Sequence, residues 1–190
     1  MEDVVRRRLL ESSEVKRELA ESGEVEKIAR VAELIAEALR NGNKVILFGN
    51  GGSAADAQHI ACEFVGRFMK ERRSLPAIAL TTNTSCLTAI ANDYSYDIVF
   101  ERQVEAFVKK GDVVIGISTS GRSRSVIRAI KRARELGAIT VGLTGRSGGD
   151  LVSAADICIR VPSDETPRIQ EAHIAIGHII SEIVESRLFE

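Results

Sequence analysis

The chain lacks tryptophan, and its aromatic residues make up only 4% of the 190 positions. Proteins that bind single-stranded nucleic acid by stacking need exposed aromatic rings, so no stacking surface is expected here. The chain also lacks an excess of either charge, with 26 lysines and arginines against 27 acidic residues. This balance gives no general reason to expect nucleic acid or an acidic membrane surface as a partner.

Cysteines are few and widely spaced: Cys62, Cys86 and Cys158, with no Cys-x-x-Cys pair. Their odd number and wide spacing argue against a disulfide framework and against a zinc knuckle, so we expect a reducing, cytoplasmic environment. No apolar run approaches the roughly 18 residues needed to cross a membrane, and the first residues are charged. We therefore expect neither export nor a membrane anchor.

The spacing of apolar residues predicts the order of the secondary structure. Helical spacing predicts helices over residues 2–22 and 24–40, ahead of the first strand. Apolar runs predict five strands, at 45–48, 77–80, 113–117, 139–143 and 157–161. Further helices are predicted from Ser53 onward and over 85–91, 98–109, 125–136 and 168–187. Residues 92–94 are predicted to form a turn, and Pro162 and Pro167 to bracket an extended connection.

Strands that alternate with helices and are apolar throughout indicate a parallel sheet covered on both faces. We therefore expect one α/β domain over residues 1–190, a three-layer sandwich in which five parallel strands lie within 44–190. An N-terminal helical pair over 1–43 precedes this core. Such a pair packs on its own core or against another subunit, and we favour another subunit. Ligands are expected at the C-terminal ends of the strands.

Two loops of small residues follow predicted strands and lead into predicted helices. The free N–H groups and the dipole at such a helix start favour an anion. Neither loop has a Walker A or a G-x-G-x-x-G sequence, and no acidic residue for a ribose is evident, so a nucleotide fits poorly. Several short donors suit a monophosphate, although serines that only cap a helix give the same pattern. The loops comprise Asn50, Gly51, Gly52 and Ser53, and Ser118, Thr119, Ser120 and Ser123 with the residues between them.

His59 and Glu63 are four residues apart in the helix after the first loop, so they share one face. An imidazole and a carboxylate suit proton transfer, but such a pair is as often a solvated surface pair. The last predicted helix adds Gln170, His173 and His178 among isoleucines and alanines, where polar groups need a partner or a function. Gln170 and His178 lie roughly 12 Å apart along the helix axis, so the two side chains reach one point only with difficulty. Two chains meeting at the site would remove this difficulty.

Four segments together resemble the sugar isomerase (SIS) superfamily and, within it, the phosphoheptose isomerases. They are residues 49–63 (GNGGSAADAQHIACE), 88–97 (TAIANDYSYD), 116–123 (GISTSGRS) and 168–178 (RIQEAHIAIGH). The serine loops alone identify only the superfamily. His59 with Glu63, and Gln170 with His178, are similar to the isomerases rather than to their non-catalytic relatives.

The resemblance implies the SIS fold and an aldose–ketose isomerase that converts sedoheptulose 7-phosphate to D-glycero-D-manno-heptose 7-phosphate, early in the synthesis of bacterial surface heptose. It implies Glu63 as the base, His178 as the acid, and a homotetramer with active sites between subunits. Zinc would be held by His59, Glu63, Gln170 and His178. Substrate and phosphate would be held by Asn50, Gly51, Gly52, Ser53, Glu63, Asn92, Asp93, Ser118, Thr119, Ser120, Ser123 and Gln170.

The chemistry of such a reaction fits these residue types. Moving a carbonyl between C1 and C2 needs a base to transfer a proton between the two carbons, and an acid or a metal to stabilise the enediol oxygens. Zinc would either polarise those oxygens or only stabilise the site.

Two other functions are considered. A non-catalytic SIS module would sense a sugar phosphate or serve as a protein-interaction scaffold, and Glu63 with His178 argue against it. The isomerase half of an amino-sugar enzyme would be expected to carry an amidotransferase segment.

Overall fold

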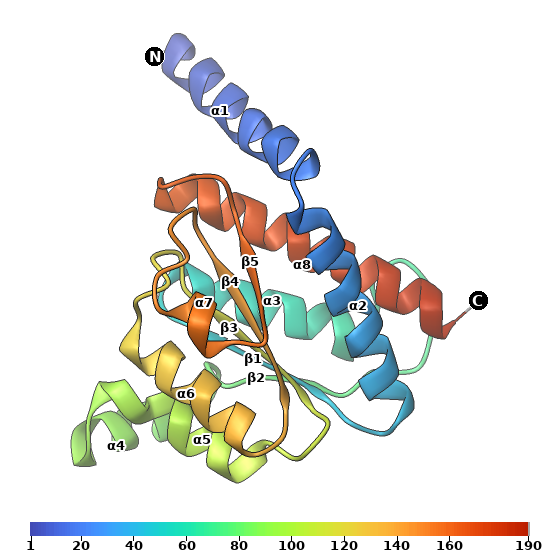
Figure 1. The fold of residues 1–190 in the computed structure, drawn as a ribbon, viewed down its shortest axis with the longest axis vertical. Coiled ribbons are helices and arrows are strands. Elements are labelled where there is room, and N and C mark those ends of the chain that lie inside the picture. Colours follow the sequence, from blue (N-terminus) through green and yellow to red (C-terminus); the bar gives the residue numbers. More distant parts are fainter. Residues whose placement is uncertain (190) are drawn as a thin grey trace.

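A computed structural model describes residues 1–189 and contains a five-stranded sheet in which all strand pairs are parallel (Figure 1). The strand order is β2-β1-β3-β4-β5, and every residue of β1 and β3 is buried. The predicted α/β fold with five parallel strands is therefore confirmed. The strands are β1 (Val45–Gly49), β2 (Ala77–Ala79), β3 (Val113–Ile117), β4 (Ile139–Thr144) and β5 (Ile157–Arg160).

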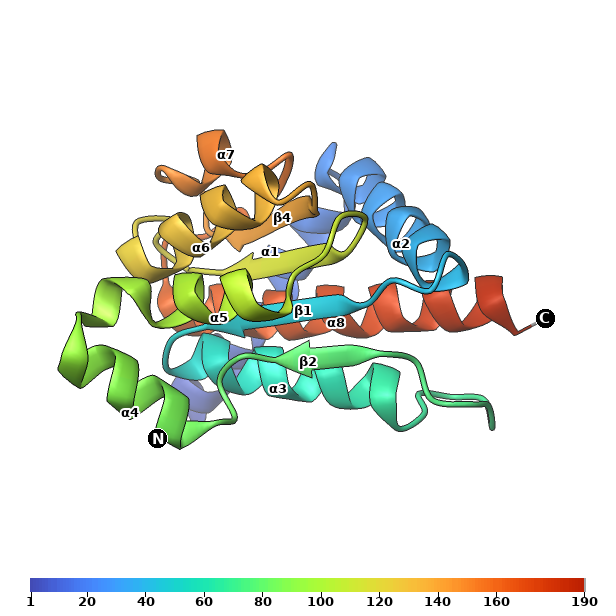
Figure 2. The same ribbon diagram turned by 90° about the horizontal axis from the view of Figure 1, so that it is seen from below.

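Helices cover both faces of the sheet and make three layers (Figure 2). One face packs against α2 (Glu24–Arg40), α3 (Gly52–Val65) and α8 (Thr166–Leu188). The other packs against α5 (Val99–Phe107), α6 (Arg124–Glu135) and the one-turn helix α7 (Leu151–Ala154). Helix α4 (Thr84–Asp93) and the 3-10 turn η1 (Tyr96–Ile98) lie between β2 and α5. No helix within residues 1–189 has the length and apolarity to span a bilayer.

The strand order reverses direction between β1 and β3. From β1 the chain moves outward to β2, and it then returns to β3 on the other side of β1. The ladder between β1 and β3 ends with Gly49 opposite Ile117, so the loops that follow the two strands begin side by side. In open parallel sheets, a crevice for ligands forms at such a reversal.

The two N-terminal helices differ in their contacts with the rest of the chain. Helix α2 packs on α8 and β5, and its residues Val31 and Ile35 are fully buried. Helix α1 (Glu2–Ala20) instead extends beyond the body of the molecule (Figure 1), and Leu19 is its one buried residue. Its side chains Val4, Val5, Leu9 and Leu10 are 51% to 67% exposed.

Several predicted boundaries are wrong. Helix α8 begins at Thr166, so Pro167 stands in its first turn, where a missing N–H costs nothing, and does not end an extended connection. Helix α4 continues to Asp93, so Asn92 and Asp93 are helical and not part of a turn. Helix α7 has no counterpart in the predictions, because a single turn carries too few residues to show helical periodicity.

Candidate functional site

The two small-residue loops meet at the C-terminal edge of the sheet, as predicted. The Asn50 side chain joins them, because its Nδ2 donates to Ser123 Oγ at 2.8 Å and to Ser125 Oγ at 3.1 Å. The hydroxyl of Tyr96 donates to Asn50 Oδ1 at 2.7 Å and so fixes the orientation of the amide. Neither Ser125 nor Tyr96 was predicted as a site residue. Nothing in their local sequence marks them, since the loop-to-loop contact exists only in the folded chain.

The hydroxyl-rich loop, residues 118–123, is held in place by backbone hydrogen bonds to the next loop along the sheet edge. The Gly145 N–H donates to Thr119 O at 2.9 Å, and the Leu151 N–H donates to Gly121 O at 3.0 Å. Thr119 and Ser120 border a cavity of about 270 Å³ at this edge. The loop therefore offers hydroxyls at fixed positions next to the start of α6, an arrangement that suits an oxyanion.

His59, Glu63 and His178 come together between α3 and α8. His59 Nε2 lies 3.0 Å from Glu63 Oε1 and 2.9 Å from His178 Nε2. His178 Nε2 lies 4.0 Å from the same carboxylate oxygen. The Glu63 side chain is 19% exposed, and the two histidines are 51% and 41% exposed. The cluster therefore places one partly buried carboxylate and two imidazoles where solutes can reach them.

The donor atoms of this cluster fit a zinc ion. All three lie within 4.8 Å of one another. Two ligands of a tetrahedral zinc, each about 2.1 Å from the metal, are about 3.4 Å apart, and the observed separations of 2.9, 3.0 and 4.0 Å bracket that value. Two nitrogens and one carboxylate oxygen are also donor types that zinc accepts.

Close contact between α3 and α8 positions the cluster. A Cβ added at Gly177 would lie 2.5 Å from Ile60 Cδ1, so only glycine allows α8 to approach α3 at this level. His178 is the next residue, and it therefore reaches His59. At the other end of the contact, a Cβ at Gly52 would collide with the amide of Gln170. Gly177 thus allows the close approach of the two helices at the level of the cluster, whereas the atoms near Gly52 are the end of the flexible Gln170 side chain.

Gln170 lies apart from the other three predicted metal ligands. Its amide packs against Gly52 in the first turn of α3. His59 follows Gly52 by seven residues, which corresponds to about 10 Å along the helix. Within one chain, the structure brings together three of the four predicted ligands, and Gln170 stands near the first loop instead.

Asp56 lies on the face of α3 that carries the cluster and was not predicted as a site residue. Its Oδ2 is buried and has no hydrogen-bond partner within residues 1–189. Burial raises the pKa of the Asp56 carboxyl to about 6, against the opposing effect of the nearby His59. The spacing of three residues between Asp56 and His59 was the signal that could have revealed it.

Asn92 and Asp93, which were predicted to complete the pocket, lie at the end of α4. Both are exposed, and Asn92 Nδ2 donates to Asp93 Oδ1 at 2.9 Å. Across residues 1–189, no hydrogen bond joins either side chain to the two loops. The helix that carries them has no buried residue. Within one chain, Tyr96 and not this pair contacts Asn50.

His173 is a core residue and not part of the cluster. It is a fully buried residue of α8, with Nε2 3.2 Å from the Thr144 carbonyl oxygen at the end of β4. Burial lowers the pKa of His173 to about 4, despite the hydrogen bond to Thr144. The residue is therefore a neutral imidazole that links α8 to the sheet.

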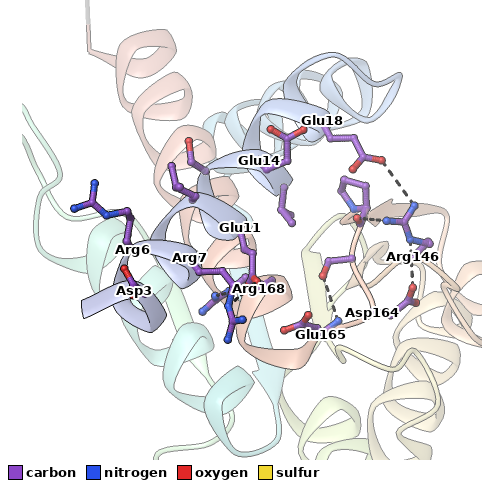
Figure 3. Close-up of a pocket in the computed structure, with 15 residues that line it drawn as sticks. Asp3, Arg6, Arg7, Glu11, Glu14, Glu18, Arg146, Asp164, Glu165 and Arg168 are labelled. Atoms are coloured by element: carbon purple, nitrogen blue, oxygen red, sulfur yellow. Dashed lines mark hydrogen bonds and ion pairs between the residues drawn. The ribbon is translucent and has the colours of Figure 1, made fainter. Parts of the chain in front are cut away.

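A larger hollow, of about 800 Å³, lies between α1 and the connection from β5 to α8 (Figure 3). It contains none of the predicted site residues. Its walls carry both charges in pairs: Arg146 lies 3.7 Å from Glu18 and 3.3 Å from Asp164, and Arg168 lies 3.7 Å from Glu11. These charges pair with one another and are not arranged around a predicted site residue, so size alone does not mark the site.

Comparisons with known proteins agree with the fold. The SIS domain family matches residues 10–145. The chain is 57% identical over 190 residues to the phosphoheptose isomerase of Aquifex aeolicus, covering 100% of this chain and 99% of that protein. It is 52% identical over 190 residues to the phosphoheptose isomerase of Clostridium acetobutylicum, covering 100% and 97%. The solved phosphoheptose isomerase of Neisseria gonorrhoeae superposes with a TM-score of 0.91 at 44% identity, covering 97% of this chain and 98% of that one.

The chain therefore belongs to the SIS domain family. Within that family it groups with the phosphoheptose isomerases, and the predicted class of enzyme, an isomerase, is confirmed.

Proposed function

We propose that this chain interconverts sedoheptulose 7-phosphate and D-glycero-D-manno-heptose 7-phosphate in the cytoplasm, as an early step of bacterial surface heptose synthesis. The observation that carries the proposal is the placement of Glu63 and His178 within 3.0 Å of His59 and 4.0 Å of each other, with His59 and Glu63 on the helix that begins at the first small-residue loop. The similarity to phosphoheptose isomerases over the whole chain supports the choice of substrate. The three free thiols support a reducing compartment.

Proton transfer is assigned to Glu63 and His178. Glu63 takes a proton from the carbon next to the carbonyl and returns it to the neighbouring carbon. His178 donates a proton to the carbonyl oxygen, so that the intermediate is an enediol rather than an enediolate, and it then takes the hydroxyl proton from the neighbouring oxygen as the new carbonyl forms. The contact of 3.0 Å between His59 Nε2 and Glu63 Oε1 places the carboxylate against the imidazole. Partial burial of that carboxylate keeps competing water away from the proton.

The phosphate is assigned to the two loops at the sheet edge. Ser118, Thr119, Ser120 and Ser123 are the hydroxyl donors, and Asn50 through Ser53 form the facing wall. The link from Asn50 to Ser123 supports a single pocket built from both loops. A phosphate held here would lie at the start of α6, where backbone N–H groups add to the hydroxyls.

We also propose that the cluster holds one zinc ion per site. His59, Glu63 and His178 would be ligands from one chain, and Gln170 would complete the set. When bound, zinc would supply a Lewis acid for the substrate oxygens. Calorimetric titration of metal-free protein with zinc tests the assignment: His59→Gln should reduce the affinity at least tenfold, and an unchanged affinity would refute the ligand role.

A homotetramer with active sites between subunits is the proposed assembly, formed by a single SIS domain whose residues 1–43 contribute to oligomerisation. The exposed apolar side chains of α1 support this assembly, because apolar patches of this kind mark interfaces. So does an apolar groove of about 380 Å³ between α1, α2 and α8, lined by Leu19, Val25, Ile28, Ile176, Ile179 and Ile183 among others. The distance of Gln170 from the other ligands supports a contribution from a second chain.

The reaction is tested directly by incubating purified protein with sedoheptulose 7-phosphate, with and without a chelator, and measuring the aldose. We expect product in the untreated sample. Loss of product with the chelator, and its return with zinc, would assign the metal a role in catalysis. Absence of product under all conditions would contradict the isomerase and favour the alternative, a sugar-phosphate-sensing SIS module.

A further inference from the structure

A buried ion pair lies behind the catalytic cluster and has no part in the chemistry described above. Arg72 Nε and Glu185 Oε1 are 2.7 Å apart, and each side chain is only 2% exposed. Arg72 belongs to the segment between α3 and β2, and Glu185 belongs to the last turns of α8. Removing two charges from water is costly unless every lone pair and proton has a partner. The hydrogen-bond partners of Arg72 and Glu185 therefore show which segments of the chain the ion pair holds in place.

Glu185 binds the turn that follows α3. Its two carboxylate oxygens accept hydrogen bonds from the backbone N–H groups of Phe68, Met69 and Lys70, at 3.0, 2.8 and 2.8 Å. Burial raises the pKa of the Glu185 carboxyl, but these three donors and Arg72 outweigh that effect and hold it below its ordinary value. The carboxylate is therefore charged, and it fixes three successive peptide groups.

Arg72 binds the end of α3 itself. Its guanidinium donates to the carbonyl oxygen of Glu63 at 2.7 Å and to those of Phe64 and Gly66 at 3.0 and 3.3 Å. The last carbonyls of a helix lack partners within the helix, and a cation is favoured there. One of these carbonyls belongs to the residue assigned as the catalytic base. The ion pair therefore fixes the backbone of Glu63 through the hydrogen bond from Arg72 to its carbonyl oxygen.

The turn bound by Glu185 also reaches the second catalytic residue. The ring of Phe68 packs against the imidazole of His178, with centroids 5.7 Å apart and planes tilted by 33°. The same imidazole also lies near the His59 ring, at a centroid distance of 5.1 Å. His178 thus contacts two rings, and the position of Phe68 depends on Glu185.

We propose that Arg72 and Glu185 are positioning residues for the isomerase site, where they fix Glu63 through its backbone and His178 through Phe68. Only the expected effect on turnover rests on the proposed function. The arrangement of His59, Glu63 and His178 depends on the Arg72–Glu185 ion pair whether or not the protein is an isomerase. In Figure 2 the segment between α3 and β2 lies beside the C-terminal part of α8, away from the loops at the opposite end of α3.

The chain offers a matched control in Asp112, a carboxylate that is just as buried but remote from the cluster. Its side chain is 1% exposed and pairs with Lys44 at 2.6 Å. It also accepts the backbone N–H groups of Lys44 and Lys109, at 3.1 and 2.8 Å. Asp112 directly precedes β3, at the edge of the sheet opposite the loops. Glu185→Gln and Asp112→Asn each remove one buried charge, so both should lower the thermal midpoint.

Only Glu185→Gln should change the site. We expect its kcat to fall by about 10- to 100-fold, since displacement of a reacting group by about 1 Å has that effect, while KM changes less than threefold. Zinc affinity of the metal-free protein, measured by calorimetry, should fall at least fivefold. Asp112→Asn should leave both quantities within twofold of the parent protein. If Glu185→Gln loses stability but keeps kcat and zinc affinity within twofold, the pair is purely structural and the proposal is wrong.

A milder variant covers the case in which Glu185→Gln fails to fold. Phe68→Leu leaves the ion pair and the backbone hydrogen bonds in place and removes only the ring beside His178. It should lower kcat at least threefold with little change in KM, and it should shift the NMR signals of the His178 ring. Unchanged signals and unchanged kcat would show that the turn does not act on His178. If the parent protein is inactive, the ring signals and the zinc affinity still decide the question.

Discussion

The two halves of the site are built in opposite ways. The phosphate half follows a local pattern, in which a strand, a hydroxyl-rich loop and a helix succeed one another along the chain. The catalytic half is assembled by the contact of α3 with α8, whose residues His59 and His178 are 119 positions apart. Damage to the first half should therefore stay local and weaken binding. Damage to the second should alter chemistry, even when the substituted residue touches no substrate.

The largest effect is expected for Glu63→Gln. Removal of the base should lower kcat by about 10²–10⁴-fold, while the substrate still binds through the intact loops. Steady-state kinetics and a direct binding titration separate the two effects. Glu135→Gln, at an exposed position in α6, serves as the control and should behave as the parent protein. Turnover that survives Glu63→Gln would remove this residue from the mechanism.

A smaller but still large effect is expected for Gly177→Ala, which tests the contact between the helices. The added methyl group meets Ile60, and overpacking of this kind costs about 1–3 kcal/mol of unfolding free energy. We also expect kcat to fall at least tenfold, since His178 would move away from His59.

Pairing this variant with Ile60→Ala gives its control. The second substitution removes the atoms that the new methyl group meets, so the double variant should recover part of the lost kcat and stability. Strictly additive losses in the double variant would show that the approach of the helices does not set the geometry of the cluster.

Ser120→Ala tests the phosphate half and should have a more modest effect. The loss of one hydroxyl donor to a charged phosphate should raise KM by about tenfold and leave kcat within about threefold. Ser153→Ala, which alters an exposed serine in α7, is the matched control. A fall in kcat without a rise in KM would contradict the division of labour between the two halves.

The last prediction, for which no change in turnover at neutral pH is expected, concerns stability alone and tests how α8 is tied to the sheet. The pKa of His173 is about 4 in the folded protein and 6.5 in the unfolded chain. Between pH 4 and pH 6.5 the unfolded chain therefore binds more protons at His173 than the folded protein does. The free energy of unfolding should fall by about 3 kcal/mol as the pH is lowered from 6.5 to 4.

Asp56 titrates in the same range with the opposite sign, since its raised pKa favours the folded state as the pH falls. The effect of His173 is therefore measured as a difference between the parent protein and His173→Gln, by urea unfolding at a series of pH values. The variant should lose less stability toward pH 4 than the parent protein. Equal slopes would show that His173 does not remain neutral in the fold.

Most of the fold was predictable from the sequence, because helical spacing of apolar residues indicates helices and short apolar runs indicate strands. The five strands and the long helices were found in this way, and the one-turn helix α7 was not. At the site, the two loops and the pair of His59 with Glu63 were visible as local patterns. Ser125 and Tyr96 were missed because their partner Asn50 is distant in sequence, and Asp56 was missed although its spacing of three residues from His59 is visible in the chain.

The hydroxyls, carboxylates and imidazoles of the site, and the elements that carry them, can be assigned from the chain alone, because backbone periodicity and loop composition are local properties. The contact of His178 with His59, and the position of Gln170 beside Gly52, arise only when the chain is folded. That outcome depends on how closely two helices approach, and the approach is set by the absence of a side chain at Gly177. It also depends on the buried ion pair of Arg72 and Glu185, whose partners are 113 residues apart in the chain.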